Sequence, residues 1–101
     1  MAIVAVSITP IGTGETSVSR YVAAAEKVLR AEPRIKYRMD PMFTTIQGDL
    51  KDIFDVILKM HEAVAELGAV RISSVIKVDD RRDKPSDMDA KLASVAKKLK
   101  E

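Results

Sequence analysis

The stretch Ile35–Gly48, IKYRMDPMFTTIQG, decides the fold of this 101-residue chain. Residues 35–39 and residues 42–48 each have the length and the content of apolar and β-branched residues that are typical of a short strand. Asp40–Pro41 lies between them and favours a turn. The stretch therefore predicts a β-hairpin near the middle of the chain.

An amphipathic helix is predicted on each side of this hairpin. The first has Thr16 or Ser17 as its N-cap and ends before Pro33, and the second begins at Asp49 and ends at Gly68. Each has one stripe of apolar residues at helical spacing. The stripes are Val18, Tyr21, Val22, Ala25, Val28 and Leu29 in the first helix, and Ile53, Ile57, Met60, Val64 and Leu67 in the second.

Two further strands and a last helix complete the pattern. Residues 2–9 alternate apolar and small residues, and residues 70–78 form the longest predicted strand. The order of elements predicts an α+β, ferredoxin-like fold, in which an antiparallel sheet carries both crossover helices on one face. The length predicts one domain, residues 1–101. After Ser86 comes a C-terminal helix, with apolar residues Met88, Leu92, Val95 and Leu99.

The composition excludes several kinds of site and partner. Without cysteine the chain has no disulfide, iron–sulfur cluster or thiolate zinc site, and its single histidine makes any other zinc site unexpected. The 17 basic and 15 acidic residues are interspersed, so no nucleic-acid partner is expected. No apolar run is long enough to span a membrane, and no secretion signal is visible. We therefore expect a cytoplasmic protein without a membrane partner.

One face of the predicted sheet is left uncovered by the helices. Either Met42, Thr44 and Ile46 or Phe43, Thr45 and Gln47 could face the helices; the first set is favoured, which leaves Thr45 and Gln47 on the other side of the third strand. The uncovered face has many small and hydroxyl-bearing residues, which indicates a ligand or a second subunit against it, although a solvated face is also polar. Its residues in the outer and first strands are Ala5, Ser7, Thr9, Arg71, Ser73, Val75 and Lys77.

No group of residues in the sequence predicts catalysis. His61 has no second histidine four residues on, as a metalloprotease helix would, and is expected on a helix surface. The loop Gly12–Ser17 lacks the lysine and the spacing of a phosphate-binding loop. An enzyme acting on a small anion is still an alternative, using this loop with Lys77 and Arg81. Its general base would be Asp79, Asp80 or His61.

Several short motifs, in order along the whole chain, carry a resemblance to a known family. They are SITPIGTG at residues 7–14, SVSRYVA at residues 17–23, Tyr37, Pro41–Met42, Thr44, Gly48, HEA at residues 61–63 and IKVDDRRD at residues 76–83. With these motifs the chain resembles the small thiamine-binding protein family, YkoF-like in fold. The resemblance implies a ferredoxin-like subunit and a homo-dimer that joins its sheets, or a homo-tetramer. It also implies binding of thiamine or its hydroxymethylpyrimidine moiety, with no known reaction and no cofactor or metal.

The resemblance further implies a ligand site on the uncovered sheet face and at nearby strand ends. Two positions depart from the family pattern, with Phe43 in place of glycine and Gln47 in place of glutamate. Phe43 can stack on a ligand ring, whereas Gln47 removes a charge that would favour a cationic ring. The positions that match the family's pocket are Ser7, Ser19, Tyr37, Thr44 and Lys77, with Thr45 beside them.

The most concrete hypothesis is therefore small-molecule binding without catalysis. Ser7, Thr44 and Gln47 would hydrogen-bond the edge of a pyrimidine, and Phe43 or Tyr37 would cover its ring. One alternative is a structural homo-oligomer with no ligand, in which another subunit buries the open face. The other alternative is the enzyme for a small anion described above.

Overall fold

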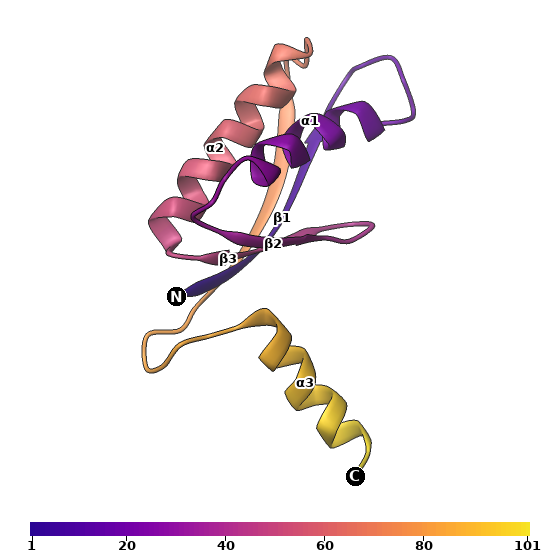
Figure 1. Ribbon diagram of the computed structural model, residues 1–101. Helices are drawn as coiled ribbons and strands as arrows, with labels where there is room; N and C mark the ends of the chain where they lie inside the picture. Colours follow the sequence, from indigo (N-terminus) through magenta and orange to yellow (C-terminus); the bar gives the residue numbers. More distant parts are fainter.

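The computed structural model describes residues 1–101, which form a four-stranded sheet and three helices (Figure 1). The strand order is β2-β3-β1-β4, and every neighbouring pair is antiparallel. This confirms the predicted ferredoxin-like α+β fold with a C-terminal helix. The elements are β1 (Ala2–Pro10), α1 (Ser19–Arg30), β2 (Lys36–Met39), β3 (Thr44–Gly48), α2 (Leu50–Glu66), β4 (Ile72–Asp80) and α3 (Met88–Leu99).

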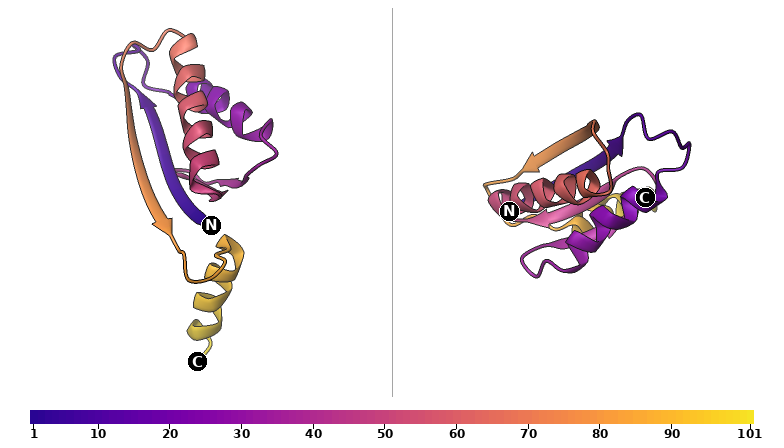
Figure 2. Two further views of the ribbon diagram at one scale, coloured as in Figure 1. Left: turned by 90° about the vertical axis from the view of Figure 1, so that its left-hand side faces the viewer. Right: turned by 90° about the horizontal axis from the view of Figure 1, so that it is seen from above.

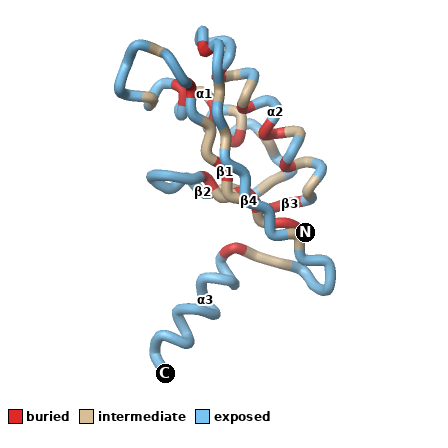
Figure 3. Tube along the Cα trace, turned by 180° about the vertical axis from the view of Figure 1, so that it is seen from behind, coloured by how far each residue is buried: buried red, intermediate tan, exposed pale blue.

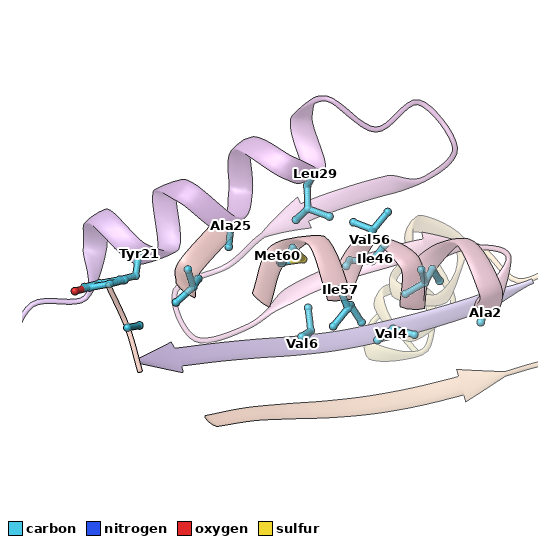
Figure 4. Close-up of a cluster of buried hydrophobic side chains, with 13 residues drawn as sticks. Ala2, Val4, Val6, Tyr21, Ala25, Leu29, Ile46, Val56, Ile57 and Met60 are labelled. Atoms are coloured by element: carbon cyan, nitrogen blue, oxygen red, sulfur yellow. The ribbon is translucent and has the colours of Figure 1, made fainter. Parts of the chain in front are cut away.

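Helices α1 and α2 lie together on one face of the sheet (Figure 2). The register fixes which residues meet them, because Val4 of β1 pairs with Ile46 of β3 and with Val78 of β4, and paired residues share a face. Val4 and Ile46 are fully buried, together with Leu29 of α1 and Ile53 of α2. Figure 4 shows these side chains filling the space between the sheet and the two helices. Most residues of the two predicted helical stripes therefore lie in or against the core, whereas Val22 and Leu67 are 36% and 39% exposed.

Several predicted boundaries differ from the structure by two residues or so. β4 begins at Ile72 rather than at residue 70, and Val70 is 96% exposed in the connection before it. β3 begins at Thr44, so Met42 lies exposed in the turn and does not face the helices as expected, whereas Ile46 does. The N-cap of α3 is Asp87, not Ser86: its side chain accepts a hydrogen bond from the amide of Ala90 at 3.0 Å.

The two inner strands differ in length, and this positions the candidate site. β1 has nine residues, but β3 pairs only with residues 2–6 of it. Residues 7–10 of β1 therefore pair with β4 on one side and have no strand on the other. The space beside this unpaired edge is closed by α1 and by the turn at residues 40–43.

β4 and α3 are the least covered parts of the molecule. β4 is an edge strand, and Ile76 and Val78 remain 38% and 40% exposed although they lie on the helix side of the sheet. α3 points away from the body, and of its residues only Met88 is buried (Figures 2 and 3). Its apolar residues Leu92, Val95 and Leu99 are exposed. None of the three helices combines the length and the apolar character needed to cross a membrane.

Candidate functional site

A cavity of about 230 Å³ lies beside the unpaired end of β1. Val6, Ala25 and Met60 form its inner wall, pointing inwards from β1, α1 and α2 (Figure 4). The turn between β2 and β3 closes the outer side. The remaining lining residues are Ser7, Ile8, Thr9, Val18, Val22, Glu26, Met39, Asp40, Pro41, Met42, Phe43 and Thr44.

The polar groups of this cavity are hydroxyls and carboxylates. Thr44 contributes a hydroxyl, and Glu26 and Asp40 contribute carboxyl groups. Ser7 and Thr9 line the cavity from the unpaired end of β1, where they alternate with Val6 and Ile8 and lie on the open-face side of the strand. No lysine, arginine or histidine lines it. A concave site with two carboxyl groups and no basic residue favours a cationic or hydrogen-bond-donating ligand over an anionic one.

Glu26 is the most unusual residue of the site. Its Oε1 accepts a hydrogen bond from the Thr44 hydroxyl at 2.8 Å, which links α1 to β3. Its Oε2 is buried and has no hydrogen-bond partner. Burial raises the pKa of the Glu26 carboxyl, and the hydrogen bond from Thr44 opposes this rise. The buried Oε2 of Glu26 therefore lacks the hydrogen-bond donor that a buried acceptor normally has.

Glu26 was missed by the reading of the sequence, which followed only the apolar residues of α1. A signal was present, because Glu26 lies four residues after Val22 and three before Leu29, and so belongs to the same helix face. A carboxyl group within a buried stripe needs a partner or a function.

The apolar part of the lining suits a flat ring. Phe43, in the turn, is partly exposed and presents an aromatic face. Met39 and Met42, on either side of the turn, are exposed and have flexible thioether side chains that can adapt to a ligand. The combination of one aromatic ring, adaptable methionines and a few polar groups is typical of a small-molecule site.

A second cavity, of about 610 Å³, adjoins the first along α1. The two share Val18, Val22, Glu26 and Met39 as lining residues. Unlike the first cavity, the second has basic lining residues, Lys27 and Arg30, which favour a negatively charged group. Its other polar residues are Ser17 and Ser19, whose hydroxyl oxygens lie 3.1 Å apart.

The structure brings together only part of the set of site residues expected from the sequence. Ser7, Phe43 and Thr44 line the first cavity, and Ser19 lines the second. Tyr37 lies on the helix side of β2, against the core. Thr45 and Lys77 both pair with Ala5 and so lie in one row on the open face.

Gln47 has a structural contact that the sequence did not predict. Its side-chain oxygen accepts a hydrogen bond from the amide of Met88 at 2.8 Å, in a buried position. This bond satisfies an amide at the start of α3, which has no partner inside the helix. Gln47 therefore holds α3 to the sheet and lines neither cavity.

The residues of the enzyme alternative lie far apart. The loop Gly12–Ser17 follows the β1 end that pairs with Ile72, whereas Lys77 lies five strand positions away, roughly 17 Å. Arg81 lies beyond the opposite end of β4, and its guanidinium group donates two hydrogen bonds to Asp83. No cluster of three or more histidine, aspartate or glutamate side chains is arranged to hold a metal ion.

Comparisons with known proteins agree with this architecture. The chain is 48% identical to the UPF0045 protein YqgV of Bacillus subtilis, over 98% of both chains. Its fold matches the crystal structure of the hypothetical protein MJ1052 of Methanocaldococcus jannaschii with a TM-score of 0.83, at 34% identity and over 94% of this chain and 96% of that one. A Thermotoga maritima protein described as a candidate for thiamine biosynthesis or salvage has the same fold, with a TM-score of 0.78 over 93% and 97% of the two chains. At 16% identity this likeness concerns the fold alone.

The family model described as thiamine-binding protein matches residues 4–96, which is nearly the whole chain and includes both cavities. This match and the similarity to YqgV agree with the resemblance carried by the sequence motifs. The chain therefore belongs to the thiamine-binding protein family and is also similar to proteins described as UPF0045.

Proposed function

We propose that this protein binds thiamine or its hydroxymethylpyrimidine moiety, without catalysis, in the cavity between β1, α1 and the β2–β3 turn. The observation that carries the proposal is the lining of this cavity, in which two carboxyl groups and the Thr44 hydroxyl accompany an aromatic ring and no basic residue. Membership in the thiamine-binding family supports the same ligand class.

The chemistry of thiamine matches this lining. Thiamine joins an aminopyrimidine, which has hydrogen-bond donors and acceptors at its edge, to a permanently cationic thiazolium ring. The hydroxyl of Thr44 can serve the pyrimidine edge, Phe43 can stack on a ring, and Glu26 and Asp40 favour positive charge. Ser7 borders the same cavity at the unpaired end of β1.

The dimensions also support a ligand made of two rings. Sites for whole drug-sized ligands usually measure about 300–1,000 Å³, so the first cavity suits a single ring. The second cavity shares four lining residues with the first and offers room for the rest of the ligand, with Ser19 beside it. Thr45 and Lys77 would take part only in a ligand or a subunit bound on the open face.

Thermal unfolding in the presence of thiamine, thiamine phosphates and hydroxymethylpyrimidine tests the proposal. A ligand at 100 times its dissociation constant should stabilise the protein by about 2.7 kcal/mol, seen as a rise of the melting temperature by several degrees. The compound that gives the shift identifies the chemical half that is recognised. If none of these compounds moves the melting temperature at millimolar concentration, the proposal is wrong and the structural alternative is favoured.

We also propose that the protein forms a homo-dimer or a homo-tetramer. The outer edge of β4 supports this, because it offers nine residues with no strand beyond them and includes the exposed apolar residues Val75, Ile76 and Val78. β2, at the other edge, is protected by Lys36 and Arg38, which form ion pairs with Asp89 of α3. Light scattering after size exclusion measures the mass, and a monomer at micromolar concentration would contradict this part of the proposal.

A further inference from the structure

Glu26 lies where the two cavities meet, together with Val18, Val22 and Met39. It lines both cavities and is the only acidic residue that does so. It lies on the buried side of α1, between positions that pack into the core. A ligand that extends from one cavity into the other would pass this side chain.

The hydrogen bonds of Glu26 are incomplete. A carboxylate can accept about four hydrogen bonds, but Glu26 accepts only the one from Thr44. No lysine or arginine forms an ion pair with it, although Lys27 and Arg30 line the second cavity. Its Oε2 has neither a protein partner nor contact with water. A buried polar atom in this state is costly, and a donor brought by a ligand would remove that cost.

We infer that Glu26 determines the specificity of the site by accepting a hydrogen bond from an amino group on the ligand's ring. This inference rests on the proposed function and names the part of the ligand that is read: the amino substituent of the pyrimidine. The site should accordingly bind an amino-substituted ring more tightly than the same ring with an oxo group, which presents an acceptor to an acceptor.

The surroundings of Glu26 allow this contact with a small movement. Met39 is part of the wall between the two cavities, is exposed, and has an unbranched, adaptable side chain. The terminal torsion of a glutamate side chain is broad, so the carboxyl plane can turn toward a donor. The Thr44 hydroxyl can remain bonded to the other oxygen.

Asp40 is the natural comparison, because it is the other carboxyl group of the first cavity. It lies exposed at the start of the turn, so its oxygens are open to solvent. Removing its charge changes the electrostatic potential of the cavity but removes no buried acceptor. Asp40→Asn is therefore a matched control for Glu26→Gln.

Calorimetric titration with thiamine and with oxythiamine, which has an oxo group in place of the amino group, tests the inference. Both compounds carry the same thiazolium charge, so an effect of charge alone cancels in the ratio of their affinities. The unaltered protein should bind thiamine at least about tenfold more tightly than oxythiamine. Glu26→Gln should lose most of this preference, because the glutamine amide can donate to an oxo group as well as accept from an amino group, and Asp40→Asn should keep it.

The possible results separate this inference from the proposed function. If thiamine binds and Glu26→Gln keeps the full preference, the inference is wrong while the binding function stands. If Asp40→Asn loses the preference as completely as Glu26→Gln, the preference does not depend on the Glu26 contact in particular, which also overturns the inference. If neither compound binds the unaltered protein, the proposed function fails and the inference fails with it. The melting temperature of each variant verifies that it is folded.

Discussion

Two side chains of this protein, Gln47 and Glu26, have buried polar atoms in different states. The amide oxygen of Gln47 accepts the Met88 amide and thereby completes the start of a helix. Glu26 has one partner, Thr44, and an oxygen with none. A satisfied buried group stabilises the fold, whereas an unsatisfied carboxylate weakens it unless it has a function.

Replacing Glu26 by Gln should stabilise the ligand-free protein at neutral pH by about 1 kcal/mol, because a neutral amide is less costly to bury than a carboxylate. Burial raises the pKa of Glu26 above its ordinary value of 4.5, so the folded state binds this proton more tightly than the unfolded state. The contribution of Glu26 to stability therefore falls as the pH rises above about 4.5. Urea unfolding at pH 4.5 and pH 7 should show the gain at pH 7 and a smaller one in acid. An equal gain at both values would contradict a raised pKa.

Replacing Gln47 by Leu should destabilise the protein by about 1–3 kcal/mol, because the buried Met88 amide would lose its acceptor. The start of α3 should fray, which lowers the helical circular dichroism signal. Gln47→Glu is the control, since a carboxylate can accept the same bond at a helix N-terminus. Equal loss in both variants would show that shape, not the hydrogen bond, matters at this position.

At the scale of the elements, the sequence predicted those helices and strands whose apolar residues recur with a clear period. Alternation in β1 and the helical stripes of α1 and α2 reflect burial against a common core, so these elements and the fold class follow from pattern. Val70 and Met42 were placed in strands because they are apolar, but both lie in exposed connections. Where a strand begins depends on its pairing with a neighbouring strand, and the local sequence pattern does not show that pairing.

The cavity could be predicted only in part. Ser7, Phe43 and Thr44 were expected in the site and line it. The cavity itself exists because β1 continues past its last pair with β3, a consequence of register that no single strand reveals. Glu26 joins the site from a helix that the sequence treated as core alone.

The apolar stripe of α3 has a measurable role if a second copy covers it. Replacing both Leu92 and Val95 by Glu should leave the stability of the separate subunit nearly unchanged, because these side chains are exposed in the described chain. If the proposed oligomer covers this stripe as well as the edge of β4, the same change should cause dissociation, measured as a lower mass by light scattering. Lys97→Glu, on the opposite side of the helix, is the control and should keep the oligomer. An unchanged mass in the double variant would show that α3 is not part of the interface.

The whole molecule has two surfaces that differ in what they can bind. Its body is compact on the helix side, while β4 and α3 extend its longest dimension to 48 Å and leave apolar residues uncovered. The cavity lies on the other side of β1 from β4, because β4 pairs along the opposite edge of that strand. Ligand binding and association of subunits can therefore use separate parts of one sheet.

The position of the ligand is best tested by following the backbone amide signals of the isotope-labelled protein in two-dimensional NMR spectra during a thiamine titration. Binding in the proposed cavity predicts shifts that saturate together at residues 7–9 and 42–44 and at Glu26, with little change at Thr45 and Lys77 on the open face. Shifts concentrated at Thr45, Lys77 and their neighbours, with the cavity residues unmoved, would contradict the account and place the ligand on the open face of the sheet.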